Sequence, residues 1–422
     1  MREATGQEVT GREAAGRAPG TDGSPRARAA LPAAGATGVS DAAVCGDRTV
    51  AERLRAVAAE VDAPDVVLAY SRHGDRTVVT GGTAPCPTTA REELRYEIGS
   101  VSKTFTGLLL AVLADRGDLR LTDRAAAHLP GPSGAPRTAG HRRGRHRRTS
   151  RPYPHPRPYV PPPAPLPLAA RARAHPHRDA ITLLHLMTHT AGLPALPRDF
   201  YPQGLPRWNT APYAGYGTER LLDAFARSRP RHAPGSRWHY SNFGVALLGT
   251  ATARATGTPY AELLARHVLA PLGLWHTGLA PAGPGVDATG RRKDGVTELP
   301  PFEAGAFTAA GGVRAAPGDL LTFLEAQLRP EETPLHAALT AVRLPLLRRG
   351  LGHRHTHTLT WFQHSAGDGP LYFHGGATLG QEVFLGFRPD TGTALVALAT
   401  RRHTHASVLA RRAYDLLAEA PL

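Results

Sequence analysis

The sequence predicts an α+β fold, in which one antiparallel sheet is built from both chain ends, is flanked by helices, and encloses an inserted, mainly helical domain. Near the start, residues 65–82 form two short β runs around a tight turn, which predicts a hairpin. Near the end, residues 370–376 predict a strand, and residues 381–400 predict a second hairpin. The intervening segments with mainly helical patterns, punctuated by Gly and Pro, are 181–194, 218–230, 241–257 and 259–274.

Three further helices complete the predicted elements. Residues 49–62 keep apolar side chains at helical spacing and open with a Thr-x-x-Glu capping box at Thr49. A second helix is expected over about 100–115, with Gly117 as its stop. The pattern of residues 404–420 predicts a terminal helix.

Composition divides the chain into parts of different character. Residues 1–45 contain no aromatic side chain and equal numbers of acidic and basic residues, which predicts a disordered tail. Residues 46–117 and 301–422 are expected to form one discontinuous α/β domain. Residues 118–300 are expected to form the mainly helical domain, which contains a Pro/Arg/His-rich low-complexity insertion at 131–178.

The positive charge of the chain comes mostly from this insertion. The 422 residues carry a formal net charge of +15, and residues 131–178 hold 11 Arg and no acidic residue. The insertion therefore accounts for +11 and leaves +4 for the rest, so we expect no basic face for specific nucleic-acid binding. A solvated, polyproline-like loop is expected, with non-specific contact to polyanions left open.

No apolar run approaches the roughly 20 residues that span a bilayer, so no membrane segment is predicted. The first residues lack the compact apolar stretch of a secretory signal, which favours a cytoplasmic location, or a secreted one if the start site is misassigned. Cys45 and Cys86 allow one disulfide or two free thiols. The oligomeric state is left open by the sequence.

Lys103 is notable because lysine is rare in this chain. Among the 50 basic side chains there are two lysines, Lys103 and Lys293. A lysine where arginine is the usual cation indicates a role that requires loss of the proton near neutral pH. Ser100 lies three residues earlier, on the same face of the predicted helix, so a deprotonated Lys103 could activate its hydroxyl as a nucleophile. Desolvation by apolar neighbours would lower the pKa of Lys103, as this role requires.

The segment around this pair, EIGSVSKTFTG at 97–107, resembles the active-site motif of the serine β-lactamase and penicillin-binding-protein family. The similarity is to the branch of class C β-lactamases and DD-peptidases, and it spans roughly 50–420 apart from the insertion. Other segments that resemble the family are 185–194, 309–324 and 384–392. The resemblance implies a β-lactamase/transpeptidase-like fold and no cofactor.

A second motif of that family, Tyr-x-Asn, is matched by Tyr240 and Asn242 within PGSRWHYSNFG at 234–244. The resemblance implies that Tyr240 shares the general-base work with Lys103 and later protonates the leaving group. It also implies that Asn242 forms hydrogen bonds with the substrate amide and with Lys103. A cationic lysine beside Tyr240 would favour the phenolate form.

The third motif is matched by His374, Gly375 and Gly376, followed by Ala377. In the family this segment is a sheet edge that lines the cleft, where two glycines let a substrate backbone approach. Backbone N–H groups of Ser100 and Ala377 would form the oxyanion hole. His374 occupies the place of the lysine of typical β-lactamases, which is similar to some DD-peptidases and esterases and argues against efficient β-lactam hydrolysis.

Two other kinds of site fit the sequence less well. The chain lacks the Gly-x-Ser-x-Gly turn of α/β-hydrolases and any phosphate-binding glycine pattern. Histidine-rich spacings could suggest a metal, but the zincin-type form needs Glu where Leu186 stands, so no metal site is predicted. These spacings are His185 with His189, His353 with His355 and His357, and His403 with His405.

The sequence therefore predicts a serine hydrolase that acts on an amide or ester of a small molecule or peptide through an acyl-enzyme on Ser100. D-alanyl-D-alanine carboxypeptidase-like or esterase-like activity is favoured over efficient β-lactamase activity. Two alternatives stay open: a transacylase that uses the same acyl-enzyme, and a catalytically silent, penicillin-binding-like protein. Retention of Lys103 in so arginine-rich a chain argues against the silent form.

Overall fold

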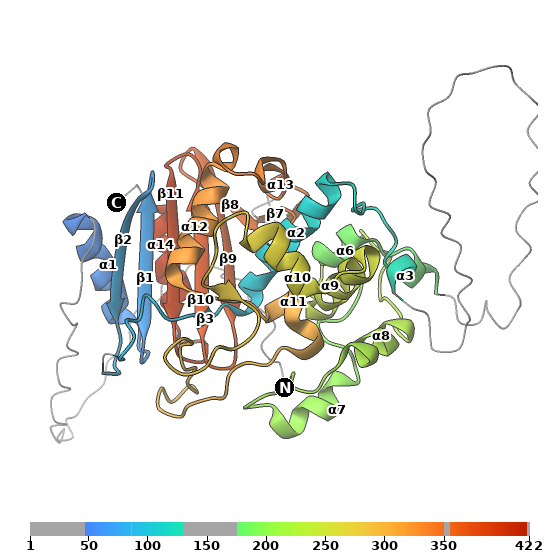
Figure 1. Ribbon diagram of the computed structural model, residues 1–422, viewed down its shortest axis with the longest axis horizontal. Helices are drawn as coiled ribbons and strands as arrows, with labels where there is room; N and C mark the ends of the chain where they lie inside the picture. The colour runs from blue at the N-terminus through green and yellow to red at the C-terminus, as the bar shows by residue number, and fades with distance from the viewer. Residues whose placement is uncertain (1–46, 86, 130–174, 350–354, 420–422) are drawn as a thin grey trace, which may run out of the picture.

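The computed structural model describes residues 47–85, 87–129, 175–349 and 355–419 (Figure 1). The predicted N-terminal tail, both cysteines and His353 lie outside the described residues, as does the predicted insertion up to residue 174. The last residues of the predicted insertion are described, and they start a short helix, α5, at Pro176–Asp179. The predicted division into domains stays a prediction.

An eight-stranded antiparallel sheet, in the order β2-β1-β11-β10-β9-β8-β7-β6, forms the centre of the molecule. Its strands are β1 (Val66–Arg72), β2 (Asp75–Gly81), β6 (Leu347–Arg349), β7 (His355–His357), β8 (Phe362–Ala366), β9 (Gly369–Ala377), β10 (Glu382–Arg388) and β11 (Thr393–Ala399). Strand β1 pairs with β2 on one side and with β11 on the other. The prediction that both ends of the chain contribute to one sheet is therefore confirmed, as are both hairpins.

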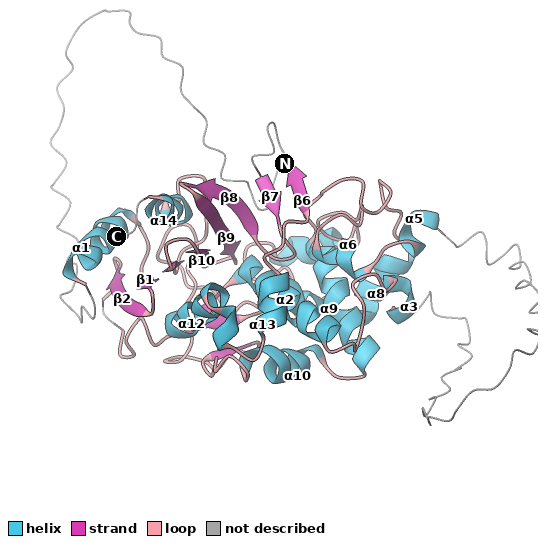
Figure 2. Ribbon diagram, turned by 90° about the horizontal axis from the view of Figure 1, so that it is seen from above, coloured by secondary structure: helices cyan, strands magenta, loops and turns pink. Residues whose placement is uncertain are grey.

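Helices cover both faces of this sheet (Figure 2). On one face lie α1 (Arg48–Glu60) and α14 (Leu409–Ala418), and on the other lie α2 (Ser102–Asp115) and α12 (Pro317–Leu328). Alternate residues of β11 enter the two cores, because successive side chains of a strand point to opposite faces. The sheet is therefore buried on both sides. The last residues of β9 extend beyond its pairing with β8 and pack against the 3₁₀ turn at residues 99–101, directly in front of α2.

The mainly helical part lies beside the sheet (Figure 1). Its helices are α3 (Ala125–His128), α6 (Leu183–Met187), α7 (Phe200–Gly204), α8 (Thr218–Ala226), α9 (Asn242–Thr256), α10 (Tyr260–Leu264) and α11 (Thr308–Gly311), with α13 (His336–Ala341) against α2. Helix α2 packs against α9, α10, α11 and α13, and its Phe105 stacks on Phe323 of α12, so it is buried around almost its whole circumference. Within the described ranges no helix has the length and apolar character needed to cross a membrane.

A second, small sheet includes the segment that directly precedes α2 in the chain. Its order is β3-β5-β4, with β3 at Tyr96–Glu97, β5 at Arg314–Ala315 and β4 at Thr277–Gly278. Pairing of β3 with β5 connects the residues that precede Ser100 with a segment more than 200 residues later in the sequence. The start of α2 is thus fixed by long-range contacts as well as by its own hydrogen bonds.

Three local predictions differ from the structure. The capping box at Thr49 is wrong, because Asp47 caps α1 and accepts hydrogen bonds from the backbone N–H groups of Thr49 and Val50. The regular α-helix begins at Ser102 instead of Ser100, since residues 99–101 form a tighter 3₁₀ turn. Strands β6, β7 and β8 were not predicted, because their short segments lack a clear alternating pattern.

Candidate active site

Ser100 lies in a tight turn directly in front of α2. This 3₁₀ turn, Gly99–Val101, packs against β9. Gly99 has a φ of +48°, and a Cβ at this position would lie 2.5 Å from the carbonyl oxygen of Ala377. Glycine suits this position because it tolerates the positive φ and leaves room for the neighbouring backbone. The turn therefore holds Ser100 at the positive end of α2 and close to β9.

Two side chains that the sequence singled out, Lys103 and Tyr240, meet at the Ser100 hydroxyl. The Tyr240 hydroxyl donates a hydrogen bond to Ser100 Oγ at 2.7 Å, and Lys103 Nζ lies 3.1 Å from the same oxygen. Lys103 Nζ also donates to the carbonyl oxygen of Ala310 at 2.7 Å and lies 4.9 Å from the centroid of the Tyr240 ring. A proton can therefore pass between Ser100 and either neighbour without a large movement.

The Lys103 ammonium is buried without a carboxylate partner. Its side chain is 1% exposed, and no acidic group pairs with it in the described parts of the chain. Loss of hydration disfavours the charged amine, so burial lowers the pKa of Lys103 to about 7. The expected lowering by desolvation is confirmed. A substantial fraction of the Lys103 side chains is therefore uncharged near neutral pH and can accept a proton.

Tyr240 is held as a neutral phenol. Burial raises the pKa of Tyr240 well above its ordinary value, and the nearby Tyr213 raises it further, although the hydrogen bond to Ser100 acts in the opposite direction. The expectation that Lys103 would favour the phenolate is wrong, because the cost of burying a negative charge dominates. Tyr240 is therefore suited to donating or relaying a proton.

His189 positions the segment that carries Tyr240. Its Nδ1 accepts a hydrogen bond from the Ser241 N–H at 3.2 Å, and its ring lies 4.6 Å from the Tyr240 ring. Burial, and then the charge of Lys103, lower the pKa of His189 well below its usual range, so the ring stays neutral. Sequence reasoning missed this supporting role, although His189 lies in one of the family-like segments. Its φ of +59° is uncommon for a residue with a side chain.

Asn242 lies at the start of α9, near this site but with different partners from those expected. Its side chain forms a hydrogen bond with the hydroxyl of Tyr213. Within the described residues, Lys103 donates to Ser100 and to the Ala310 carbonyl and not to Asn242. The structure therefore does not form the Asn242–Lys103 bond that the family resemblance implied, and Asn242 pairs with Tyr213 instead.

His374 is a neutral, buried group on β9. It is 4% exposed, and its Nδ1 lies 2.8 Å from the carbonyl oxygen of Gly375. A neutral ring that donates through Nδ1 leaves Nε2 as an acceptor. Burial, and then the positive charge of Lys103, lower the pKa of His374 to about 3. His374 thus lacks the positive charge that a lysine would bring to this position.

The two glycines of β9 have different surroundings. A Cβ on Gly376 would lie 2.2 Å from the carbonyl oxygen of Ile98, whereas a Cβ on Gly375 would meet only a backbone oxygen at 4.0 Å. We expected both glycines to admit a substrate backbone. The missing side chain of Gly376 instead makes room for the turn that carries Ser100, and Gly375 is exposed and open. Ala377 follows, also exposed, with its backbone against Gly99.

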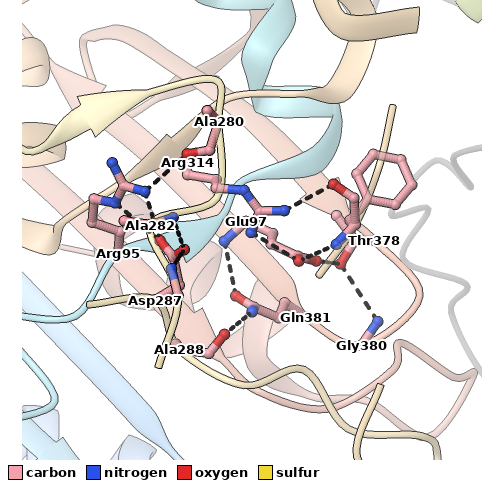
Figure 3. A network of polar contacts seen from close by, with 12 residues as sticks. Arg95, Glu97, Ala280, Ala282, Asp287, Ala288, Arg314, Thr378, Gly380 and Gln381 are labelled. Carbon is pink, nitrogen blue, oxygen red and sulfur yellow. Dashed lines mark hydrogen bonds and ion pairs between the residues drawn. The ribbon is translucent and has the colours of Figure 1, made fainter. Parts of the chain in front are cut away.

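A buried polar network surrounds the strand that precedes Ser100 (Figure 3). Its centre is Glu97, whose carboxylate accepts hydrogen bonds from Arg314 at 3.0 Å and from the Phe302 N–H at 2.7 Å. The network also includes Thr378 and Gln381, which follow β9. Sequence reasoning missed this network, since its members are far apart along the chain.

The histidine pairs serve other contacts. His185 Nδ1 lies 3.0 Å from the Thr182 hydroxyl, and His355 Nδ1 lies 2.9 Å from His364 Nε2. Across the described ranges, no three side chains of His, Cys, Asp or Glu come together as a set of metal ligands.

The pKa of Lys103 predicts a pH dependence for the reactivity of Ser100. Because only an uncharged Lys103 can take the proton of Ser100, we expect labelling of Ser100 by a fluorophosphonate to accelerate as the pH rises through about 7. His374 has a pKa of about 3 and does not titrate in this range. The measurement is the second-order labelling rate between pH 5 and pH 9. Folded Lys103→Arg and Lys103→Met proteins should lack this rise, and wild-type reactivity in either would contradict the assignment.

The packing of β9 gives a second prediction, with a matched pair of glycines. Gly376→Ala should push β9 away from the Ser100 turn, lower stability by about 1–3 kcal/mol and slow labelling on the order of 10²-fold. Gly375→Ala should change both quantities little, because its Cβ enters open space. Thermal unfolding and labelling rates test this contrast, and equal effects of the two substitutions would refute it.

Known proteins share this sequence pattern. A family model described as Beta-lactamase matches residues 50–420. A β-lactamase from Pseudomonas fluorescens is 27% identical over 253 residues, which cover 59% of this chain and 56% of that protein. The D-alanyl-D-alanine-carboxypeptidase/endopeptidase AmpH from Escherichia coli (strain K12) is 26% identical over 244 residues, which cover 55% of this chain and 48% of that protein. The chain thus spans about half the length of these curated relatives.

The matched region contains the sheet, the turn at Ser100 and each residue that meets it. The fold and the three motifs agree with this match along almost the whole described chain. The protein therefore belongs to the beta-lactamase family.

Proposed function

We propose that this protein is a D-alanyl-D-alanine carboxypeptidase-like or esterase-like hydrolase that forms an acyl-enzyme on Ser100. The observation that carries the proposal is the contact of Ser100 Oγ with both the Lys103 amine and the Tyr240 hydroxyl. A structural Ser–Lys pair would not need an amine that is buried, lacks an acidic partner among the described residues and has its pKa lowered to about 7. This combination is what general-base activation of a serine requires.

In the first half-reaction, uncharged Lys103 takes the proton of Ser100 as Oγ bonds to the carbonyl carbon. The carbonyl oxygen becomes an oxyanion, which the backbone N–H groups of Ser100 and Ala377 would stabilise. The proton then passes from Lys103 through Tyr240 to the leaving amine or alcohol as its bond to carbon breaks. In the second half-reaction, water attacks the carbonyl carbon of the resulting ester and gives a proton to the Lys103–Tyr240 pair. The pair passes this proton to Ser100 Oγ as the bond between Oγ and the carbonyl carbon breaks and the carboxylic acid leaves.

The neutral state of His374 supports hydrolysis of esters or peptides over efficient β-lactam turnover. A lysine at this position would offer a cation to an anionic substrate group, whereas His374 offers an uncharged acceptor. Asn242 and the open Gly375 would contact the substrate beside Ser100. The relatives named above include both a β-lactamase and a carboxypeptidase, at identities that do not distinguish between these activities.

Two alternatives use the same fold. A transacylase would share the acyl-enzyme and pass the acyl group to another nucleophile, and a silent penicillin-binding-like protein would bind without forming it. An added amine or alcohol that increases product release and receives the acyl group would identify the transacylase.

The test is the intact mass of the protein after exposure to a penicillin and, separately, to a fluorophosphonate. We expect one adduct of each reagent on the wild type and none on Ser100→Ala. A persistent penicillin adduct supports a carboxypeptidase-like enzyme, and its rapid loss would indicate β-lactamase turnover instead. Folded wild-type protein that forms no adduct with either reagent would contradict the proposal in favour of the silent form.

A further inference from the structure

Glu97 links the segment that precedes Ser100 with the segment that follows β9. Its Oε2 accepts a hydrogen bond from the Thr378 hydroxyl at 2.7 Å, and the side-chain oxygen of Gln381 accepts one from the Glu97 N–H at 2.9 Å. Figure 3 shows Thr378 and Gln381 approaching Glu97 from the chain that follows β9. Glu97 is 5% exposed, so little water competes with these bonds.

The positions of these residues along the chain connect the network with the site. Glu97 lies three residues before Ser100, and Thr378 lies one residue after Ala377. The Glu97–Thr378 hydrogen bond therefore links the two segments whose backbone N–H groups would bind the oxyanion. A shift of either segment would change the separation of those two donors.

Close backbone packing leaves the two segments without a side-chain spacer. A Cβ on Gly99 would lie 2.5 Å from the Ala377 carbonyl oxygen, and one on Gly376 would lie 2.2 Å from that of Ile98. These contacts limit how closely the segments approach, but contact alone does not prevent them from separating. The hydrogen bond from Thr378 resists separation, so packing and hydrogen bonding together fix the distance.

The Thr378 bond can be removed without leaving a buried charge unpaired. Glu97 keeps its ion pair with Arg314, at 3.0 Å, whatever stands at position 378. Thr378 is half-buried, and its hydroxyl also lies 3.4 Å from the Gly380 N–H, which is a long contact. A substitution of Thr378 thus changes the link between the two segments more than the charge balance of the core.

We propose that Thr378, through its hydrogen bond to Glu97, is a positioning residue that sets the distance between the Ser100 and Ala377 N–H groups and so the fit of the oxyanion hole. This inference rests on the proposed acyl-enzyme chemistry at Ser100. An oxyanion hole stabilises its charge only when both donors are correctly placed, and misplacement on the order of 1 Å can cost a factor of about 10² in rate.

The test is Thr378→Val, which keeps the shape of the side chain and removes the hydroxyl. Inactivation by a fluorophosphonate gives two constants, the maximal rate kinact and the half-saturating concentration KI. Because the phosphoryl oxygen occupies the oxyanion hole most fully in the transition state, we expect kinact to fall between about 10- and 100-fold with little change in KI. The affinity for phenylboronic acid, which forms a tetrahedral adduct with serine, should fall with kinact. Thr378→Ser should restore both.

Thr400→Val is the matched control. The Thr400 hydroxyl donates to Asp65 at 2.8 Å, and Asp65 is paired with Arg91, so the chemistry repeats that of Thr378, Glu97 and Arg314. Thr400 follows β11, two strands away from β9 in the sheet. Its substitution should lower thermal stability while kinact and KI stay at wild-type values.

The outcomes separate this inference from the proposed function. A wild-type protein that labels at Ser100, together with a Thr378→Val protein that labels at the same kinact, would overturn the positioning role and leave the function intact. A change confined to KI, or an equal loss in Thr400→Val, would overturn it too. If Thr378→Val does not fold, Thr378→Ala must show the same fall in kinact. Failure of wild-type protein to label at all would refute both the function and this role.

Discussion

The burial of an unpaired lysine amine beside a serine hydroxyl is the constraint on which the rest of the structure depends. Lys103 can be uncharged near neutral pH only while α2 stays between the sheet and the helical part, which keeps water and carboxylates away from it. Removing a charge from water is costly, so the fold must hold this arrangement with other contacts. The tight packing of β9 and α11 around the Ser100 turn provides them.

The groups around Lys103 are arranged so that they do not add charge. His189 and His374 are both neutral rings, because their burial and the lysine itself oppose a second positive charge. Tyr240 is likewise an uncharged phenol. The ion pair between Glu97 and Arg314, which connects β3 with β5, balances its own charges. The reactivity of Ser100 therefore depends on the protonation of the Lys103 amine, while the neutral groups around that amine hold it in position.

The sequence alone predicted the structural features that short sequence motifs indicate. The sheet from both chain ends, its hairpins and the Ser100–Lys103 pair follow from local patterns, and the meeting of Tyr240 with Ser100 follows from the family resemblance. Sequence reasoning failed where the outcome depends on three-dimensional surroundings, as with the protonation of the buried Tyr240 and with Asn242, which pairs with Tyr213 and not with Lys103. Long-range contacts such as the Glu97 network have no local signal at all.

The most direct test of the account is the titration of Lys103 itself. With two lysines in the chain, ¹³C-labelled lysine gives two side-chain signals by NMR, and Lys293→Arg assigns them. Lys293 is exposed and serves as the internal reference for Lys103, which is buried. The account predicts that the Lys103 signal titrates with a pKa of about 7. A Lys103 pKa at the ordinary value of about 10.4 would contradict it, because the amine would then stay protonated and could not activate Ser100.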